Sequence, residues 1–160
     1  FSIMPTNLYG PNDKFDSFES HVIPALILKF HNAKKNKIKK VNIIGNGSAK
    51  RDFLYIDELS KAIIKLLNTE EDKLFNIFKK KSLYHVNIGS SSEYSIKNLI
   101  KIITNEINYK GKIEYDNNNI YNGTVRKKLD NTIINSIGWK NNTSLEKGIK
   151  KTIRWYLANL

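Results

Sequence analysis

The residues best placed to do chemistry lie in a polar loop near the start of the chain. Residues 1–4 are apolar and predict a strand, and residues 5–13 predict a turn-rich loop interrupted by Gly10 and Pro11. Open α/β sheets hold their ligands at the carboxyl ends of such strands. The side-chain amide of Asn7 can both donate and accept hydrogen bonds there. The pattern predicts a ligand-binding loop, although an ordinary strand-to-helix connection has the same composition.

The composition argues against metal and thiol chemistry. The chain contains no cysteine, so disulfides and thiolate metal sites are excluded. The histidines, His21, His31 and His85, do not have metal-ligand spacing, and no structural zinc site is expected. A lone Gly-x-Gly at residues 45–47 predicts a tight turn better than a phosphate loop.

The formal net charge of +12 raises the question of an anionic partner. Most of the excess is lysine, which accompanies many asparagines and isoleucines, and these residue types share adenine-rich codons. Genome base composition therefore explains the charge without a partner, although a positive field favours anionic ligands such as sugar nucleotides. A non-catalytic, nucleic-acid-binding domain is the alternative. Against it, the lysines look scattered and no aromatic-rich basic stripe is visible.

Strand and helix periodicities alternate along the rest of the chain, which predicts an α/β fold with parallel pairing. Strands are expected over residues 41–44, 53–56, 83–88 and 113–115, and a polar, irregular surface insertion over residues 69–82. Helices are expected after Ser20, Asp57 and Ser95 as N-caps, and after a capping box at residues 143–146. Ser20 as N-cap would place His21 in the first helical turn.

The length and ends of the sequence bound its organisation. At 160 residues the chain is long enough for one domain with a sizeable core. No stretch approaches the ~20 apolar residues of a membrane span, and nothing resembles a signal peptide. The sequence begins with Phe1 inside an apolar run, which suggests a piece whose beginning lies elsewhere.

Several motifs together resemble a known family. Residues 5–11 (PTNLYGP) and 51–57 (RDFLYID) resemble two signatures of the extended short-chain dehydrogenase/reductases that act on sugar nucleotides. Residues 20–31 and 123–130 (GTVRKKLD) resemble, more narrowly, the GDP-L-fucose synthase family. Residues 86–89 and 144–149 also fit, so the resemblance covers essentially the whole chain, with a break at 69–82 and a loose stretch at 117–122.

The resemblance implies the C-terminal half of an extended Rossmann-type, NAD(P)-binding fold with a smaller α/β substrate-binding domain. Members of this superfamily carry a Gly-rich dinucleotide loop and a Tyr-x-x-x-Lys motif in their N-terminal half, and neither motif occurs here. Residues 1–12 and 53–94 would be cofactor-domain elements. Residues 13–52 and 95–160 would form the substrate-binding domain, and this chain alone would be inactive.

The resemblance also implies roles for individual residues. The cofactor would be NADP, with the loop at residues 5–8 along its nicotinamide end and no metal site. His21 would be the acid of the epimerisation and would also touch the cofactor. The matched cofactor positions are Pro5, Thr6, Asn7, Leu8 and His21, and the matched substrate positions are Val22, Leu26, Lys29, Ile44, Arg51, Asn122 and Lys127. Lys29, Ile44 and Asn122 depart from the usual arginine, tryptophan and aspartate.

The implied reaction is the NADPH-dependent 3,5-epimerisation and 4-reduction of GDP-4-keto-6-deoxy-D-mannose to GDP-L-fucose. A cytoplasmic homodimer with a GDP-sugar substrate is implied, without nucleic-acid or membrane partners. Another sugar-nucleotide epimerase or dehydratase of the same superfamily is the nearest alternative.

Overall fold

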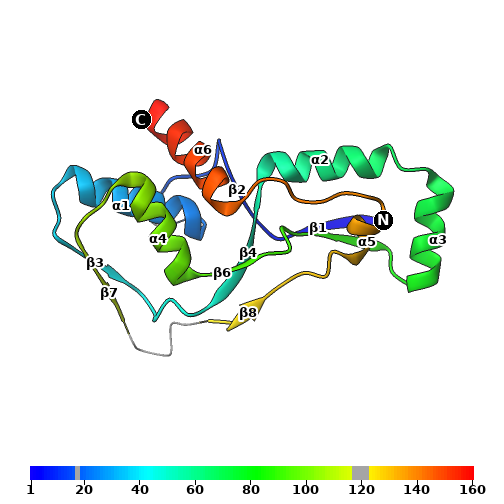
Figure 1. The fold of residues 1–160 in the computed structure, drawn as a ribbon, viewed down its shortest axis with the longest axis horizontal. Coiled ribbons are helices and arrows are strands. Elements are labelled where there is room, and N and C mark those ends of the chain that lie inside the picture. Colours follow the sequence, from blue (N-terminus) through cyan, green and yellow to red (C-terminus); the bar gives the residue numbers. More distant parts are fainter. Residues whose placement is uncertain (17–18, 117–122) are drawn as a thin grey trace.

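The computed structural model describes residues 1–16, 19–116 and 123–160, and it has the expected α/β architecture. Figure 1 shows an elongated molecule, with α3 at one end and the pair β3 and β7 at the other. The strands are β1 (Ser2–Pro5), β2 (Asn7–Tyr9), β3 (Lys40–Ile43), β4 (Lys50–Tyr55), β5 (His85–Ile88), β6 (Glu93–Ser95), β7 (Lys112–Tyr115) and β8 (Arg126–Lys127). The helices are α1 (Val22–Lys35), α2 (Ile56–Leu67), α3 (Glu71–Lys81), α4 (Ile96–Ile107), α5 (Thr132–Ser136) and α6 (Leu145–Ala158).

The strands form three small sheets in which parallel pairing dominates, as the alternation of strands and helices predicts. β1 pairs with β5 and β3 pairs with β7, both in parallel. β4 is flanked by β2 in parallel and by β6 in antiparallel orientation, and β8 also pairs with β4. β4 therefore connects more elements than any other described strand.

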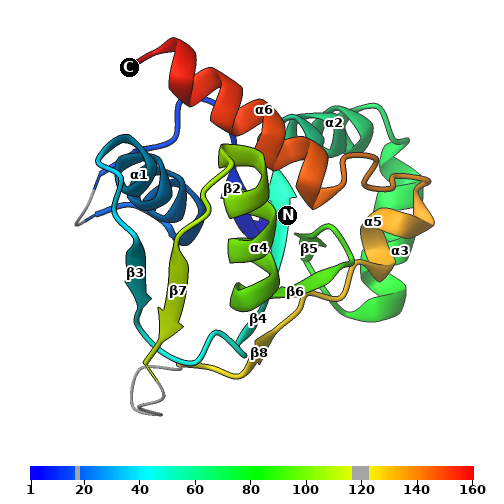
Figure 2. The ribbon, with the colours of Figure 1, turned by 60° about the vertical axis from the view of Figure 1, so that its left-hand side comes forward.

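The side chains of β4 alternate between two hydrophobic clusters, because successive residues of a strand point to opposite faces. Phe53 and Tyr55 join a cluster formed with α1, α4 and α6, and Leu54 joins one formed with α2, α3 and α5. Figure 2 shows α4 and α6 side by side, and α3 and α5 at the opposite side of the molecule from α1. The two faces of β4 are thus packed into different hydrophobic clusters.

Two segments differ from the expectation in secondary structure. Residues 71–81 form helix α3 and are not irregular, because Leu74 and Phe78, four residues apart, bury one face of the helix. Residues 7–9 form β2 within the expected loop, because the chain switches there from pairing with β5 to pairing with β4. The short length of β2 explains why periodicity did not reveal it.

One of the predicted helix caps is confirmed, one is confirmed in part and two are wrong. Ser95 caps α4 by accepting the amide of Asn98, as predicted. Ser144 alone caps α6, and Thr143 donates to Glu58, so no reciprocal capping box forms. The N-caps of α1 and α2 are the residues His21 and Tyr55, not Ser20 and Asp57.

Candidate functional site

A hollow of about 830 Å³ lies beside the link between β1 and β2. One wall is the loop that continues β1 at its carboxyl end, and the opposite wall is β8 and the residues after it. We call it the loop hollow. It is lined by residues 5–13 together with His21, Ile56, Arg126, Lys127, Lys128 and Leu129. It therefore brings together every predicted cofactor residue and one predicted substrate residue, Lys127.

The loop at the start of β2 is held by hydrogen bonds directed into the protein. The amide of Thr6 donates to the carbonyl of Ile88 at 3.0 Å, which continues the β1–β5 pairing. The Thr6 hydroxyl and the Asn7 side-chain amide both donate to the main-chain carbonyl of Asp52, at 3.0 and 2.8 Å. One hydrogen of the Asn7 side-chain amide is thus used inside the protein, and its second N–H and its Oδ1 are the capacity left for a ligand.

His21 lies at the lip of the loop hollow with an exposed imidazole. It is the N-cap residue of α1, with extended backbone angles (φ −64°, ψ 164°), and its side chain makes no capping hydrogen bond. Its main-chain carbonyl accepts the amide of Ala25 at 3.0 Å, which starts the helix. The helix therefore fixes the backbone of His21 while the imidazole stays available at the opening.

Basic side chains line the wall of the loop hollow opposite the loop. Arg126 is held by Glu93 through Nε at 2.7 and 2.9 Å and through Nη2 at 2.5 Å. The Arg126 guanidinium holds the pKa of Glu93 below its usual range. Lys127, next along β8, is the register partner of Arg51 on β4, and residues opposite each other on paired strands project from the same face. Together with Lys128, this wall offers positive charge to an anionic ligand.

The other predicted substrate residues do not line the loop hollow. Leu26 is buried in the core and Val22 is half-buried against it. Lys29 donates from Nζ to the carbonyl of Asn42 at 2.7 Å, and the side chain of Ile44 is 73% exposed. Arg51 donates from Nη1 to the carbonyls of Lys50 and Thr124, both at 2.7 Å. Asn122 lies outside the described residues.

Several lining and supporting residues were missed by the sequence reasoning. Arg126, Lys128 and Leu129 flank Lys127 in the motif at residues 123–130, and their adjacency was the available signal. Asp52 and Asn131 support the loop and the neighbouring turn from behind. The position of Asp52 within RDFLYID was a signal, whereas nothing in the local sequence marks Asn131.

Two kinds of feature are absent from the described ranges, 1–16, 19–116 and 123–160. No group of three or more His, Asp or Glu side chains there is arranged to hold a metal ion. No helix in those ranges combines the length and the apolar character that crossing a membrane requires.

Known proteins resemble this chain in sequence and in fold. Residues 1–103 match the NAD dependent epimerase/dehydratase family. Probable GDP-L-fucose synthase 1 from Oryza sativa subsp. japonica is 40% identical over 99% of this chain and 45% of its own length. GDP-L-colitose synthase from Yersinia pseudotuberculosis is 37% identical over 96% of this chain and 47% of its own length. A GDP-L-fucose synthetase from Naegleria fowleri, solved with NADP bound, superposes with a TM-score of 0.81 at 26% identity, covering 98% of this chain and 45% of that one.

The chain belongs to the NAD dependent epimerase/dehydratase family. Its resemblance to GDP-L-fucose synthases, first seen in the motifs, is confirmed by the relatives that match along nearly all of its length. The chain spans about half the length of the curated relatives it matches.

Proposed function

We propose that this chain is the C-terminal, sugar-nucleotide-binding part of an NADPH-dependent enzyme of the GDP-L-fucose synthase type. The enzyme would invert C3 and C5 of GDP-4-keto-6-deoxy-D-mannose and reduce its C4 ketone. The observation that carries the proposal is the meeting of the loop at residues 5–8, His21 and Lys127 around one hollow. Residues 1–12 and 53–94 would serve the cofactor, and residues 13–52 and 95–160 the substrate. By resemblance, the enzyme would act in the cytoplasm as a homodimer.

The lining of the loop hollow fits the nicotinamide end of NADP and a neighbouring anionic substrate. Pro5, Leu8, Ile56 and Leu129 supply an apolar surface suited to a flat ring. The positive side chains of β8 lie across from them and suit phosphate oxygens. When bound, NADPH would supply the hydride that reduces the C4 ketone.

His21 is the side chain of this chain best placed to move a proton. A C4 ketone acidifies the hydrogens on C3 and C5, so each inversion needs a proton removed from one face and returned to the other. An exposed imidazole at the lip of the hollow can return that proton, because the ring nitrogens of histidine can both carry and accept one. The fixed backbone of His21 would aim the imidazole at the sugar without a capping bond that would occupy it.

Arg51→Ala in the full-length enzyme is expected to weaken binding of the GDP-sugar by about 1.5–3 kcal/mol, the contribution of a charged hydrogen bond. Arg51 and Lys127 are register partners, so the substitution leaves one cation where two could hold a diphosphate. The Michaelis constant for the sugar nucleotide should rise while that for NADPH stays nearly constant. Arg154→Ala, on the exposed side of α6, is the matched control. An unchanged constant for the sugar nucleotide would rule out this role.

The 160-residue chain by itself is expected to oxidise no NADPH in the presence of the keto-sugar. It contains neither the Gly-rich loop that seats the pyrophosphate at a helix N-terminus nor the Tyr-x-x-x-Lys proton donor. The same assay on the full-length protein should show turnover and an epimerised, reduced product. Turnover by the isolated chain, or none by the full-length protein, would refute the proposed function.

A related GDP-sugar is the nearest alternative substrate. Ile44 is exposed where the family pattern has tryptophan, and Lys29 is bonded to β3 where the pattern has arginine. These side chains would contact the sugar nucleotide differently from those of a typical GDP-L-fucose synthase. Comparing kcat/KM for GDP-sugars that differ at C3 and C6 would separate the two substrates.

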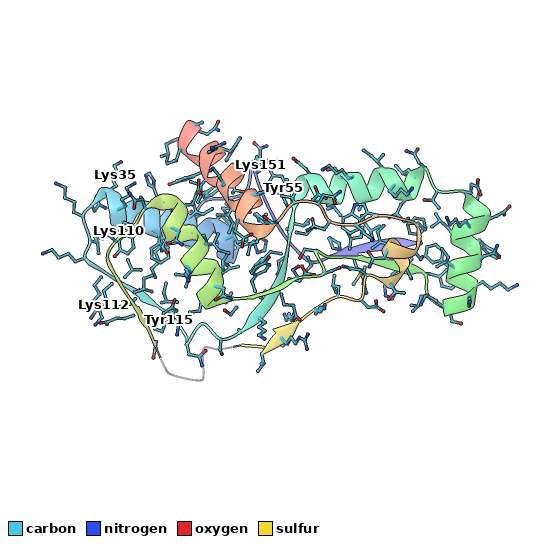
Figure 3. The ribbon with its side chains drawn as sticks, viewed as in Figure 1. Lys35, Tyr55, Lys110, Lys112, Tyr115 and Lys151 are labelled. Atoms are coloured by element: carbon cyan, nitrogen blue, oxygen red, sulfur yellow. The ribbon has the colours of Figure 1, made fainter. Side chains whose placement is uncertain are left out.

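Nucleic-acid binding is a second candidate because the lysines are less scattered than the sequence suggested. Lys34, Lys37, Lys39, Lys110 and Lys112 line one hollow of about 520 Å³, which we call the lysine hollow. Lys35, Lys110 and Lys112 extend along the same end of the molecule (Figure 3). The lysines around the lysine hollow also lie near the C-terminal ends of α1 and α4, where the helix dipoles are negative. Lys34 Nζ donates to the carbonyl of Ile107 at 2.8 Å. This contact favours a role for these lysines in capping the two helices. A salt titration with oligonucleotides decides, because sequence-independent binding with a steep salt slope would favour this candidate.

A further inference from the structure

Asp52 is a buried acidic residue that does not line the loop hollow. Its side chain is 0% exposed, and its Oδ1 accepts the amide and the hydroxyl of Ser90 at 3.0 and 2.5 Å. Its Oδ2 is buried and has no hydrogen-bond partner among the residues that the structure describes. Burial raises the pKa of Asp52, and the bonds from Ser90 only partly oppose that rise. Burying a carboxyl group with one oxygen unpaired costs free energy of folding, so its presence calls for a structural or functional reason.

The main chain of Asp52 is the fixed point for the predicted cofactor loop. Its carbonyl accepts both the Thr6 hydroxyl and the Asn7 amide, so one atom of β4 holds the place where β1 ends and β2 begins. Thr6 and Asn7 also line the loop hollow. A shift of Asp52 would therefore move the wall of the hollow.

The carboxyl group of Asp52 connects β4 to the turn that follows β5, because it accepts hydrogen bonds from Ser90 in that turn. A Cβ atom on Gly89 would lie 2.3 Å from Asp52 Oδ2, so the turn approaches the carboxyl as closely as only glycine permits. Asn131 holds the same turn from the other side, donating to the Gly89 carbonyl and accepting the Gly89 amide, both at 2.9 Å. Asp52 thus joins the carboxyl ends of β1 and β5 to β4.

Arg51 and Asp52 are neighbours on β4 and point to opposite faces of the strand. The Arg51 side chain faces the side of Lys127, where the sugar nucleotide is proposed to bind, whereas the Asp52 side chain faces the turn at Gly89 and Ser90. One strand therefore presents one residue to each half of the proposed site.

We infer that Asp52, through its bonds to Ser90, is a positioning residue for the nicotinamide-facing loop at residues 5–8. This inference rests on the proposed function and deepens it by naming what holds the cofactor side of the site. Asp52 acts through Thr6 and Asn7 and touches no reactant itself.

Asp52→Asn and Ser90→Ala in the full-length enzyme test the inference. An asparagine amide would either face the Ser90 amide, donor against donor, or bury its NH2 at the position of Oδ2 without an acceptor. We expect the Michaelis constant for NADPH to rise about tenfold, a change equivalent to about 1.4 kcal/mol. The Michaelis constant for the GDP-sugar should differ from the wild-type value by less than about twofold. Arg51→Ala should do the reverse, raising the constant for the GDP-sugar and leaving that for NADPH nearly unchanged. Ser90→Thr, which keeps the hydroxyl, should restore the value seen with serine, and Asp72→Asn on exposed α3 is the control.

Hydrogen exchange in the 160-residue chain tests the same inference without any activity. Asp52→Asn and Ser90→Ala should speed exchange of the amides of residues 6–9 about tenfold and leave those of α6 unchanged. Exchange that stays at the native rate in residues 6–9, or that rises equally in every element, would overturn the inference. If Asp52→Asn does not fold, Ser90→Ala alone decides. If the wild-type full-length protein fails to oxidise NADPH, the proposed function falls while the exchange measurement still judges the positioning of the loop.

Discussion

His21→Gln in the full-length enzyme is expected to slow inversion at C3 and C5 by about 10²–10⁴-fold, the usual contribution of a general acid or base. Glutamine keeps a hydrogen-bonding side chain of similar reach but has no proton that titrates near neutral pH. Ketone reduction should be affected far less, because its proton would come from outside these residues. The helix should also survive, because the His21 side chain makes no capping bond that glutamine would lose.

Deuterium incorporation at C3 and C5, measured alongside NADPH consumption and product stereochemistry, separates the two steps. The expected product of His21→Gln is reduced but incompletely epimerised. His31→Gln is the matched control, since His31 packs edge-on against the ring of Tyr156, away from the loop hollow. A fully epimerised product formed by His21→Gln at the native rate would show that His21 is only a helix-end residue.

Glu58→Ala is expected to lower the free energy of unfolding by about 2–4 kcal/mol, because it removes a buried carboxylate together with the hydrogen bonds that it accepts. Glu58 is 0% exposed and accepts the hydroxyl of Thr143 at 2.8 Å, the amide of Asn142 at 3.1 Å and Lys61 Nζ at 2.7 Å. These bonds join α2 to the segment that leads into α6. Chemical denaturation of the 160-residue chain measures the loss.

Two variants bracket this result. Lys61→Ala removes only an exposed partner and should cost less than about 1 kcal/mol. Asp57→Ala, one residue earlier and exposed, should cost about 0.3–1 kcal/mol through the helix dipole alone. If Glu58→Ala lowers the free energy of unfolding no more than Asp57→Ala does, Glu58 does not stabilise the junction between α2 and the segment that leads into α6.

The pH dependence of stability follows from the same bonds. Burial alone would raise the pKa of Glu58, but the hydrogen bonds from Lys61, Asn142 and Thr143 outweigh burial and lower it. Its stabilising contribution is therefore complete above the ordinary glutamate pKa and is lost as the pH falls through the lowered value in the folded state. The difference in stability between wild type and Glu58→Gln should shrink in acid. A difference that does not change with pH would contradict the lowered pKa.

Local pattern predicted the elements whose burial follows a regular period. The apolar stripe of α4, with Leu99, Ile100 and Ile103 buried, is visible in the sequence, as is the serine that caps it. Helix α3 was missed because three lysines end it and only Leu74 and Phe78 are buried on it, too few to stand out. The cap of α1 was misplaced because Ser20 instead bonds within the preceding loop, donating to the carbonyl of Lys14.

Candidate site residues that lie within a sequence motif were predicted, whereas residues brought together only by tertiary contacts were missed. The motifs located residues 5–8, His21 and Lys127, which the fold brings to one hollow. They also pointed to Lys29 and Ile44, which lie elsewhere because one is bonded to β3 and the other faces outward. The contact between Asp52 and Ser90 spans 38 residues, and no local period encodes such a contact. Contacts of this kind follow from the pairing of the strands and could not be predicted before the strands were placed.

In the proposed enzyme, the loop hollow, with Arg51 beside it, receives the GDP-sugar. The most direct test is a titration of the 160-residue chain with GDP-mannose, a stable GDP-sugar, followed in its proton–nitrogen NMR spectrum. The amides of His21, Arg51 and residues 126–129 should shift together and saturate at one concentration. The same set should shift less in Arg51→Ala at equal ligand. Shifts confined to the lysine hollow, or no shift at millimolar GDP-mannose, would contradict the claim.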